Sequence, residues 1–259
     1  MRFSVFAFAF FALAQWFSPP AMATNLVLNG SFENFTVSAG DYFCKTGTGS
    51  GATSVCTVSN VANWQTRCST TGGCGTTSTV ASLIPSGTGG SGFNNGNALG
   101  ASVPNSPDGG NFVAIDGDSA YGAPIWQVIS GLMPGNNYVV TFYQAAAQQA
   151  NAPSSVTTEW WNVTFAGVTK SSTVMTNPNR TSYQPWALQT LSFYVPITST
   201  GTETLQFLAG GTPNGVPPVS LLDGVSLVQG TPEPQSFVLV GTGLAAAIGL
   251  PRLRRRRGR

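Results

Sequence analysis

The sequence predicts an all-β fold, a single antiparallel β-sandwich, and two observations carry this prediction. Apolar stretches of strand length recur between Gly, Pro and Asn residues, and several alternate apolar with polar side chains, as half-buried strands do. No stretch between the termini shows the period of an amphipathic helix. Roughly two hundred residues of this kind suit one sandwich rather than two domains. The expected strands lie in NLVLNGSFE, NFVAID, IWQVISGL, NYVVTFYQAA, WWNVTFAGV, LQTLSFYVPI, ETLQFLAG and VSLLDGVSLV.

Residues 1–23 have the layout of a secretory signal peptide. Arg2 precedes an apolar run from Phe3 to Phe17, and small residues follow at Ala21 and Ala23. The run is short for a permanent membrane helix, and the Ala-x-Ala site predicts cleavage after Ala23. We therefore expect residues 24–230 to be an exported body.

Residues 231–259 predict a membrane anchor. Pro232, Glu233 and Pro234 are followed by an apolar stretch of about 18 residues, roughly 27 Å long as a helix. The arginines beyond it predict a transmembrane helix with a cytoplasmic end, by the positive-inside rule. A soluble core helix is disfavoured, because a cluster of like charges ends the chain. The anchor charges are Arg252, Arg254, Arg255, Arg256 and Arg257.

Without its ends the chain is mildly acidic. Residues 24–230 hold four cations and eight acids, which give a net charge of −4. This balance excludes the cationic surface of a nucleic-acid-binding protein. The cations are Lys45, Arg67, Lys170 and Arg180, and the acids are Glu33, Asp41, Asp108, Asp116, Asp118, Glu159, Glu203 and Asp223.

All the cysteines fall between about residues 40 and 96, in a Gly-, Ser- and Thr-rich segment. We interpret this segment as a long insertion with one strand near Val61–Trp64. An even set of cysteines in an exported protein predicts two disulfides, with three connectivities open. A metal site is the rival interpretation, but the spacing lacks paired C-x-x-C motifs and the chain has no histidine. We favour Cys44–Cys56 with Cys68–Cys74, because this pairing closes two local loops.

The lack of histidine also excludes Ser-His-Asp and Cys-His catalysis. Two carboxylates, such as Asp116 with Glu159, are formally available for glycoside hydrolysis, but nothing in the sequence places them across a cleft. Asp116 and Asp118 sit in a Gly-rich turn, where Asp ordinarily bonds to the backbone. From the sequence we predict that the chain is not an enzyme.

Five motifs follow one another in a fixed order: N-L-V-L-N-G-S-F-E, Asn63–Trp64, P-D-G-G-N-F-V-A-I-D-G, I-W-Q-V-I-S-G-L-M-P-G-N-N-Y-V-V-T-F and L-L-D-G-V-S-L. This order resembles the jelly-roll β-sandwiches related to carbohydrate-binding modules, with the galactose-binding-like fold. It implies that the first and last strands lie side by side and that Glu33 and Asp223 help to hold a structural calcium ion. Gly224 stands where the family often has a second acid. The alternative is that both carboxylates bond to turn or backbone donors, and we expect no other cofactor.

Aromatic side chains would form the sugar-binding face of such a module. The candidates are Trp160, Trp161 and Tyr121, with Trp126 and Trp186 as further aromatics. Adjacent tryptophans in a strand must face opposite sides, so one of Trp160 and Trp161 is expected in the core. Burial in the core is the alternative for each candidate.

The C-terminal Pro-Glu-Pro motif, short helix and arginine cluster resemble the PEP-CTERM sorting signal of Gram-negative bacteria. The resemblance implies transient anchoring in the inner membrane and processing by an exosortase. With the body, it implies a cell-surface or extracellular-matrix protein that binds or organises exopolysaccharide in a biofilm. The alternatives are a structural surface protein without a specific ligand, or an enzyme that acts on polysaccharide.

The sorting hypothesis can be tested at Glu233. The two flanking prolines hold this motif extended and open to a protease, because proline blocks continuous helix and strand pairing. Glu233→Ala should leave full-length protein in the inner membrane, whereas the unsubstituted protein should appear as a shorter, surface-exposed or released form. Immunoblots of cell fractions measure this. Protein from an exosortase-bearing host that keeps its arginine tail would show a permanent anchor instead.

Overall fold

The structure of the protein is a computed structural model that describes residues 24–36, 43–48, 55–67, 81–91, 93 and 98–230. The predicted signal peptide (1–23) and the predicted sorting signal (231–259) lie outside the described residues, and so do Cys68 and Cys74. No membrane-spanning helix occurs among the residues that the structure describes.

The described chain consists of strands, turns and loops, which confirms the predicted all-β class. The strands are β1 (Cys44–Thr48), β2 (Val55–Ser59), β3 (Gln65–Thr66), β4 (Ala81–Ile84), β5 (Phe112–Asp116), β6 (Ile125–Ser130), β7 (Asn137–Gln148), β8 (Thr157–Phe165), β9 (Val168–Ser171), β10 (Met175–Asn177), β11 (Gln184–Tyr194), β12 (Thr202–Thr212) and β13 (Pro218–Gln229).

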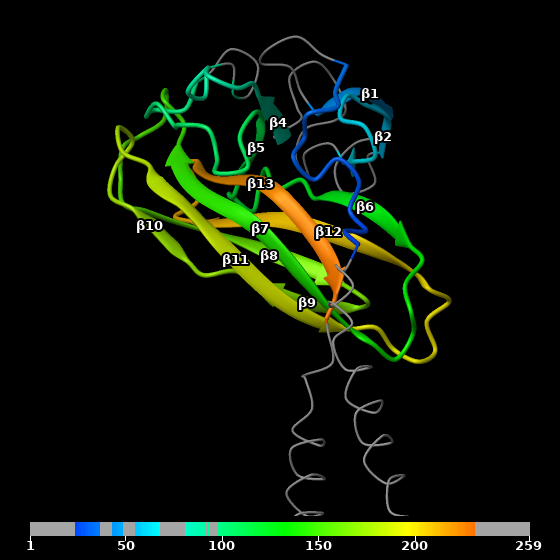
Figure 1. The fold of residues 1–259 in the computed structure, drawn as a ribbon. Helices are drawn as coiled ribbons and strands as arrows, with labels where there is room; N and C mark the ends of the chain where they lie inside the picture. The colour runs from blue at the N-terminus through cyan, green and yellow to red at the C-terminus, as the bar shows by residue number, and fades with distance from the viewer. Residues whose placement is uncertain are drawn as a thin grey trace, which may run out of the picture.

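Two antiparallel sheets form a sandwich (Figure 1). The five-stranded sheet has the order β11-β7-β13-β5-β4. The six-stranded sheet has the order β10-β8-β12-β6-β3, with β9 paired to β8. From β5 to β8 and again from β11 to β13, consecutive strands alternate between the sheets, as in a jelly roll. This alternation brings strands far apart in the sequence into register.

The N-terminal stretch NLVLNGSFE is not a regular strand, contrary to the prediction. It does lie beside β13, because the amide of Leu26 donates to Leu227 O at 2.9 Å and that of Val225 donates to Gly30 O at 3.0 Å. At Gly30 the two backbones approach so closely that a Cβ would collide with Val225 O. A turn at Asn29, whose φ is 53°, therefore replaces continued strand pairing.

The cysteine-bearing insertion has more regular structure than the sequence indicated. β1 and β2 form an antiparallel hairpin, and the short, fully buried β4 pairs with β5 at the edge of the five-stranded sheet. The strand predicted near Val61–Trp64 is a single bridge between Phe35 and Val61, and β3 begins at Gln65. β4 is only four residues long and includes Ser82, so its pattern is too short to be recognised as a strand.

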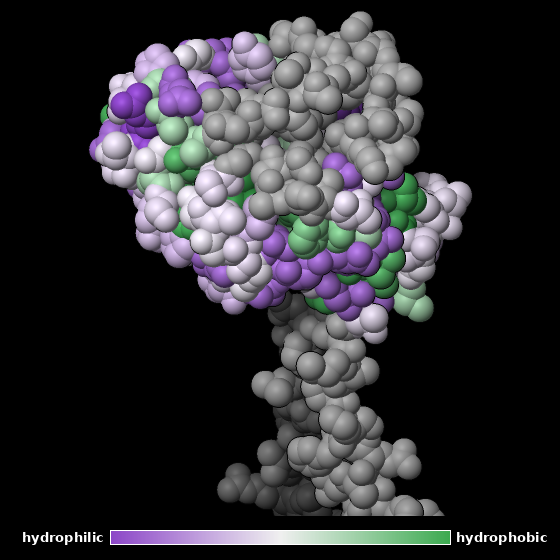
Figure 2. Space-filling model, turned by 90° about the horizontal axis from the view of Figure 1, so that it is seen from above, coloured by the Kyte–Doolittle hydropathy of each residue, from purple (hydrophilic) through white to green (hydrophobic). Residues whose placement is uncertain are grey.

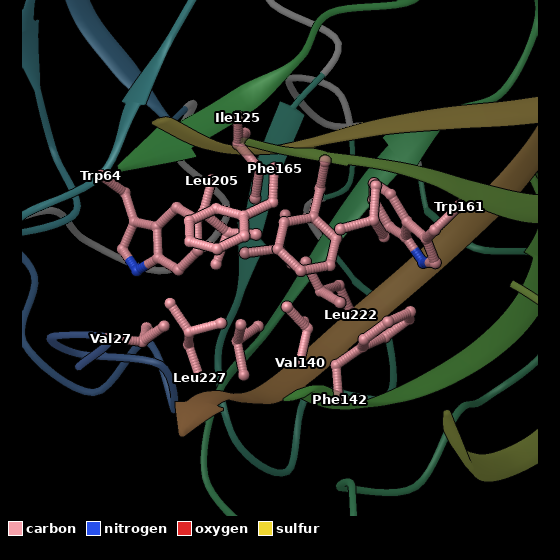
Figure 3. Packing of buried hydrophobic residues seen from close by; sticks show 14 of the residues in the cluster. Val27, Trp64, Ile125, Val140, Phe142, Trp161, Phe165, Leu205, Leu222 and Leu227 are labelled. Carbon is pink, nitrogen blue, oxygen red and sulfur yellow. The ribbon is translucent and has the colours of Figure 1, made fainter. Parts of the chain in front are cut away.

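Phe207 of β12 lies at the centre of the main core. Its ring centroid is 5.2 Å from that of Phe142, 6.1 Å from that of Trp161 and 6.2 Å from that of Trp64. Figure 3 shows the two tryptophans at opposite sides of the cluster. Their indole N–H groups donate to Leu221 O at 3.1 Å and to Asn29 O at 2.9 Å, so burying them leaves no donor unpaired.

A second, smaller core lies on the other face of the five-stranded sheet. Its members are Ile84, Phe93, Leu99, Val103, Phe112, Ala114, Ala145, Ala147, Val219 and Leu221. Trp186 closes it, with its ring 5.4 Å from that of Phe112 and its N–H donating to Pro104 O at 2.9 Å. Residues that follow β4 therefore cover part of this sheet from outside. Elsewhere, on the face seen in Figure 2, hydrophobic residues form small patches among hydrophilic ones.

Removing the Phe207 ring should destabilise the protein strongly. Phe207→Ala opens a cavity between both tryptophans and should lower the free energy of unfolding by about 3–5 kcal/mol. Phe207→Leu should have a smaller effect, and Val128→Ala, at an exposed position of the neighbouring β6, should change it by less than about 0.5 kcal/mol. Urea unfolding followed by tryptophan fluorescence measures all three. Equal losses for Phe207→Ala and Val128→Ala would contradict the central role of Phe207.

Candidate functional site

The candidate site is the outer face of the six-stranded sheet, which we call the outer face below. Strand alternation places Trp160, Asn162 and Thr164 of β8 on this face, half-buried, while Glu159 and Trp161 point into the sandwich. On β12 the outward residues opposite them are Gly210, Leu208 and Gln206. Side chains from two strands thus form one surface.

Trp160 lies across β12 because the residue opposite it has no side chain. Gly210 is its direct cross-strand partner, and a Cβ on Gly210 would be 2.5 Å from Trp160 Cε2. The indole therefore lies over the glycine backbone and stays half-exposed. Such a ring is an apolar platform for the flat face of a ligand.

Trp126 of β6 marks the other end of the outer face. It is the cross-strand partner of Gln206, and the guanidinium carbon of Arg67 lies 5.7 Å from its ring centroid. This distance suits a cation–π contact, which holds a cationic side chain beside the aromatic ring.

Beside Trp160 the outer face carries uncharged hydrogen-bonding groups on β8 and β9, whereas Leu208 of β12 lies between the two tryptophans. Ser171 Oγ donates to Asn162 Oδ1 at 2.8 Å, and the hydroxyls of Thr164 and Thr169 lie 2.8 Å apart. Gln206 stands beside them on β12. Amides and hydroxyls next to aromatic rings can bind a ligand that has both hydroxyl groups and apolar surface.

The aromatic residues predicted to bind sugar differ in their exposure to solvent. Tyr121 is 46% exposed on the loop between β5 and β6, and a Cβ on the next residue, Gly122, would lie 3.6 Å from Leu208 Cδ1. That loop therefore borders the outer face. Trp161 is fully buried and is corrected to a core residue, because its neighbour Trp160 takes the outward position.

Sequence reasoning missed Asn162, Gln206 and Arg67 as members of the site. The alternation within WWNVTF could have placed Asn162 beside Trp160, since residues two apart share a face. Gln206 and Arg67 gave no comparable signal, because their places depend on which strands pair.

The predicted calcium ligands lie in one region, where β13 passes the loop before β5. Glu33 accepts from Asn111 through the backbone N–H (2.6 Å) and through the side-chain amide (2.8 Å). Asp223 is fully buried, and Ser106 Oγ donates to its Oδ2. Its Oδ1 has no hydrogen-bond partner.

Burial raises the pKa of Asp223 to about 7, against hydrogen bonds from Ser106 and the Gly224 backbone that lower it. The charges of Asp108 and Glu33 raise it further. A partnerless carboxylate oxygen with two acids nearby fits the hard oxygen donors that Ca²⁺ takes. Among the described residues, however, no three His, Cys, Asp or Glu side chains are close enough to hold a metal, so backbone carbonyls or water would have to complete this site.

Asp116 and Glu159 do not face a common cleft. Burial raises the pKa of Asp116 to about 7, and its Oδ1 accepts the Asp118 N–H at 2.8 Å. Strand alternation puts Asp116 on the face of β5 that carries Phe112 and Ala114, whereas Glu159 points between the sheets. The five-stranded sheet therefore separates the two carboxyl groups.

Cys56 of β2 is buried and disulfide-bonded. Its cross-strand partner position in the hairpin is Gly47, and Cys44 stands opposite Ser59. The side chains of the other three cysteines lie outside the described residues, so the pairing of the four remains a prediction.

Comparisons with known proteins add solved structures of similar fold. No family model matches the sequence, and no curated protein matches it. TmCBM61 in complex with β-1,4-galactotriose is 11% identical with a TM-score of 0.41, covering 80% of this chain and 100% of that one. An apo cyclase from Fischerella sp. is 14% identical with a TM-score of 0.47, covering 82% and 98%. An arabinose-bound α-L-arabinofuranosidase is 11% identical with a TM-score of 0.41, covering 84% and 28%.

The comparisons contradict the prediction that the chain is not an enzyme, which rests on the lack of histidine and of carboxylates placed across a cleft. The similar structures include the Fischerella cyclases, a tailspike enzymatic domain and the arabinofuranosidase, beside the carbohydrate-binding modules. This chain resembles each of these structures at low sequence identity. The lack of histidine still excludes the histidine-dependent mechanisms named above.

Asp223→Asn tests the calcium site through stability. The buried acid keeps its proton to a higher pH when folded, so in chelator the stability of the protein should fall as pH rises from about 4 to 7. The variant should therefore melt higher than the unsubstituted protein at pH 8 in chelator. Calcium should reverse that order, because an ion at 100 times its Kd stabilises by about 2.7 kcal/mol.

Thermal melts in chelator and in calcium measure these two differences. Glu203→Gln, on the far part of β12, is the control, and identical calcium responses of Asp223→Asn and the unsubstituted protein would rule the site out.

Proposed function

We propose that this chain is an exported glycan-binding protein whose binding surface is the outer face between Trp160 and Trp126. The observation that carries the proposal is the Trp160 indole lying over Gly210, half-exposed at the surface. A sugar ring has an apolar face of C–H groups and an edge of hydroxyl groups. The ring of Trp160 suits the first, and the amides and hydroxyls beside it suit the second.

The spacing of the two tryptophans favours an oligosaccharide over a single sugar. Their partners on β12, Gly210 and Gln206, are four residues apart, and the two tryptophans are on either side of β12. Strand rise and strand separation then put their Cα atoms roughly 16 Å apart. An extended chain of sugars could contact both rings, Leu208 between them and the polar groups of β8 beside them.

The predicted signal peptide and the predicted sorting signal add a route by which the body would reach the cell surface. Export through the signal peptide, transient anchoring in the inner membrane and processing by an exosortase would deliver the body to the cell surface or the extracellular matrix. There it would bind or organise exopolysaccharide in a biofilm. The support for this route is the sequence of residues 1–23 and 231–259. Structural calcium at Glu33 and Asp223 would fix the N-terminal segment against β13.

Trp160→Ala tests the binding surface. An array of plant and bacterial oligosaccharides first identifies the best ligand. The substitution removes the platform without changing the core, so it should weaken the affinity for that ligand at least tenfold, as measured by calorimetry. Asn162→Ala should weaken binding less, because it removes one hydrogen-bonding group. Leu188→Ala, at a position 58% exposed on β11 of the other sheet, is the matched control. If Trp160→Ala binds like Leu188→Ala, the outer face is not the binding surface.

A further inference from the structure

A group of polar side chains lies at one end of the sandwich interior, where apolar residues would be expected. Gln144 and Gln148 come from β7, Thr157 and Glu159 from β8, and Asn177 from β10. Each is at most 1% exposed. Buried polar groups are ordinarily hydrogen-bonded, so this group needs an explanation.

The strand register brings three of these residues together. Asn177 is the cross-strand partner of Thr157, so their side chains share the interior face. Glu159 lies two residues further along β8 on the same face, and Thr157 Oγ1 donates to Glu159 Oε1. One wall of a polar site is thus built by the six-stranded sheet.

The two glutamines cross to this wall from the five-stranded sheet. Gln144 Nε2 donates to Thr173 O at 2.8 Å, two residues before the partner of Glu159 on β10. Gln148 Nε2 donates to Ser155 O at 2.7 Å, two residues before Thr157. The amides therefore reach the wall on either side of the Thr157–Glu159 pair.

These bonds leave an excess of acceptors. Since each glutamine uses its nitrogen, its Oε1 is the atom left without a partner. Asn177 Oδ1 and Glu159 Oε2 are also unpaired, and the single unpaired donor is Asn177 Nδ2. An unsatisfied buried polar group destabilises by about 1–3 kcal/mol. When Glu159 is ionised, the four unpaired oxygens favour a positively charged occupant.

We propose that this interior group binds a hard cation of the Ca²⁺ class through the unpaired oxygens of Glu159 and Asn177, which the register of β8 and β10 brings to the same interior face. Carboxylate and amide oxygens are ligands that Ca²⁺ prefers. The site is distinct from the one at Asp223, because that residue is on the opposite side of the five-stranded sheet, against Gly224, Asp108 and Tyr143. Burial raises the pKa of Glu159 to about 8, against the Thr157 hydrogen bond that lowers it. A bound cation would hold it ionised; the rival occupant is water beside a neutral Glu159.

The test uses the full chain with Asp223→Asn, so that calcium at the other site does not contribute. Calorimetry with CaCl₂ should give one ion per chain, and adding Glu159→Gln should weaken this binding at least tenfold. Glu203→Gln in the same background should leave it unchanged. Melting temperatures in CaCl₂, NaCl and KCl, against choline chloride of equal ionic strength, identify the preferred cation. Equal affinity with and without Glu159, or no response to any of the three cations, overturns the proposal in favour of water.

Asn177→Asp gives an independent test that does not depend on removing Glu159. A second carboxylate at a cation site should raise the affinity for Ca²⁺ at least tenfold and enlarge the calcium-dependent rise in melting temperature. Without a cation, two acids side by side should only destabilise the protein. A melting temperature lowered equally in calcium and in chelator would overturn the proposal.

Discussion

The two-residue period of β8 is the constraint on which the rest of the structure depends. In residues 157–165 the inward positions are buried and the outward ones half-buried, without exception. Trp161 thereby packs against Phe207 in the core, Glu159 enters the polar end of the interior, and Trp160 is left at the surface. A shift of one residue would move all three to the wrong side of the sheet, so core, interior site and outer face are fixed by one strand register.

The same strand couples the interior to the outer face. Ser220 Oγ, from the facing sheet, donates to the carbonyl of Trp160 at 3.2 Å, and Trp161 Nε1 reaches Leu221 O. The two sheets are therefore tied together at the residues that set the orientation of Trp160. Gly211 of β12 leaves room for Pro218 of the facing sheet, and Gly210 leaves room for the indole outside. The orientation of Trp160 therefore depends on its backbone and on the glycine opposite its ring.

Local patterns predicted much of this fold, and contacts between distant segments account for what they missed. Alternation correctly located β6, β7, β8, β12 and β13, because burial of one face leaves a period of two in the sequence. The turn at Asn29 could not be predicted in this way, since it follows from the approach of Gly30 to Val225. The Trp160–Gly210 pair depends on β8 meeting β12, about fifty residues later. The burial of Glu159 could not be predicted from the sequence either, because an acid in a strand is ordinarily placed on the exposed face.

Three buried acids destabilise the folded protein, and the burial of its aromatic core must offset this cost. Asp116, Glu159 and Asp223 are each almost fully buried with a raised pKa, and no ion pair to Lys or Arg is found for them in the described part of the chain. Each must keep a proton, gain a cation or accept hydrogen bonds near neutral pH, because an isolated buried carboxylate is strongly disfavoured. Backbone N–H groups of Asp118, Ala120 and Gly215 donate such hydrogen bonds to Asp116 and Asp118. Glu159 accepts from one hydroxyl, and its remaining oxygen has no hydrogen-bond partner. Asp223 likewise keeps one partnerless oxygen, so the charge states of these two acids depend most on whether a cation lies beside them. Glu159 belongs to β8, the strand that also carries the binding platform.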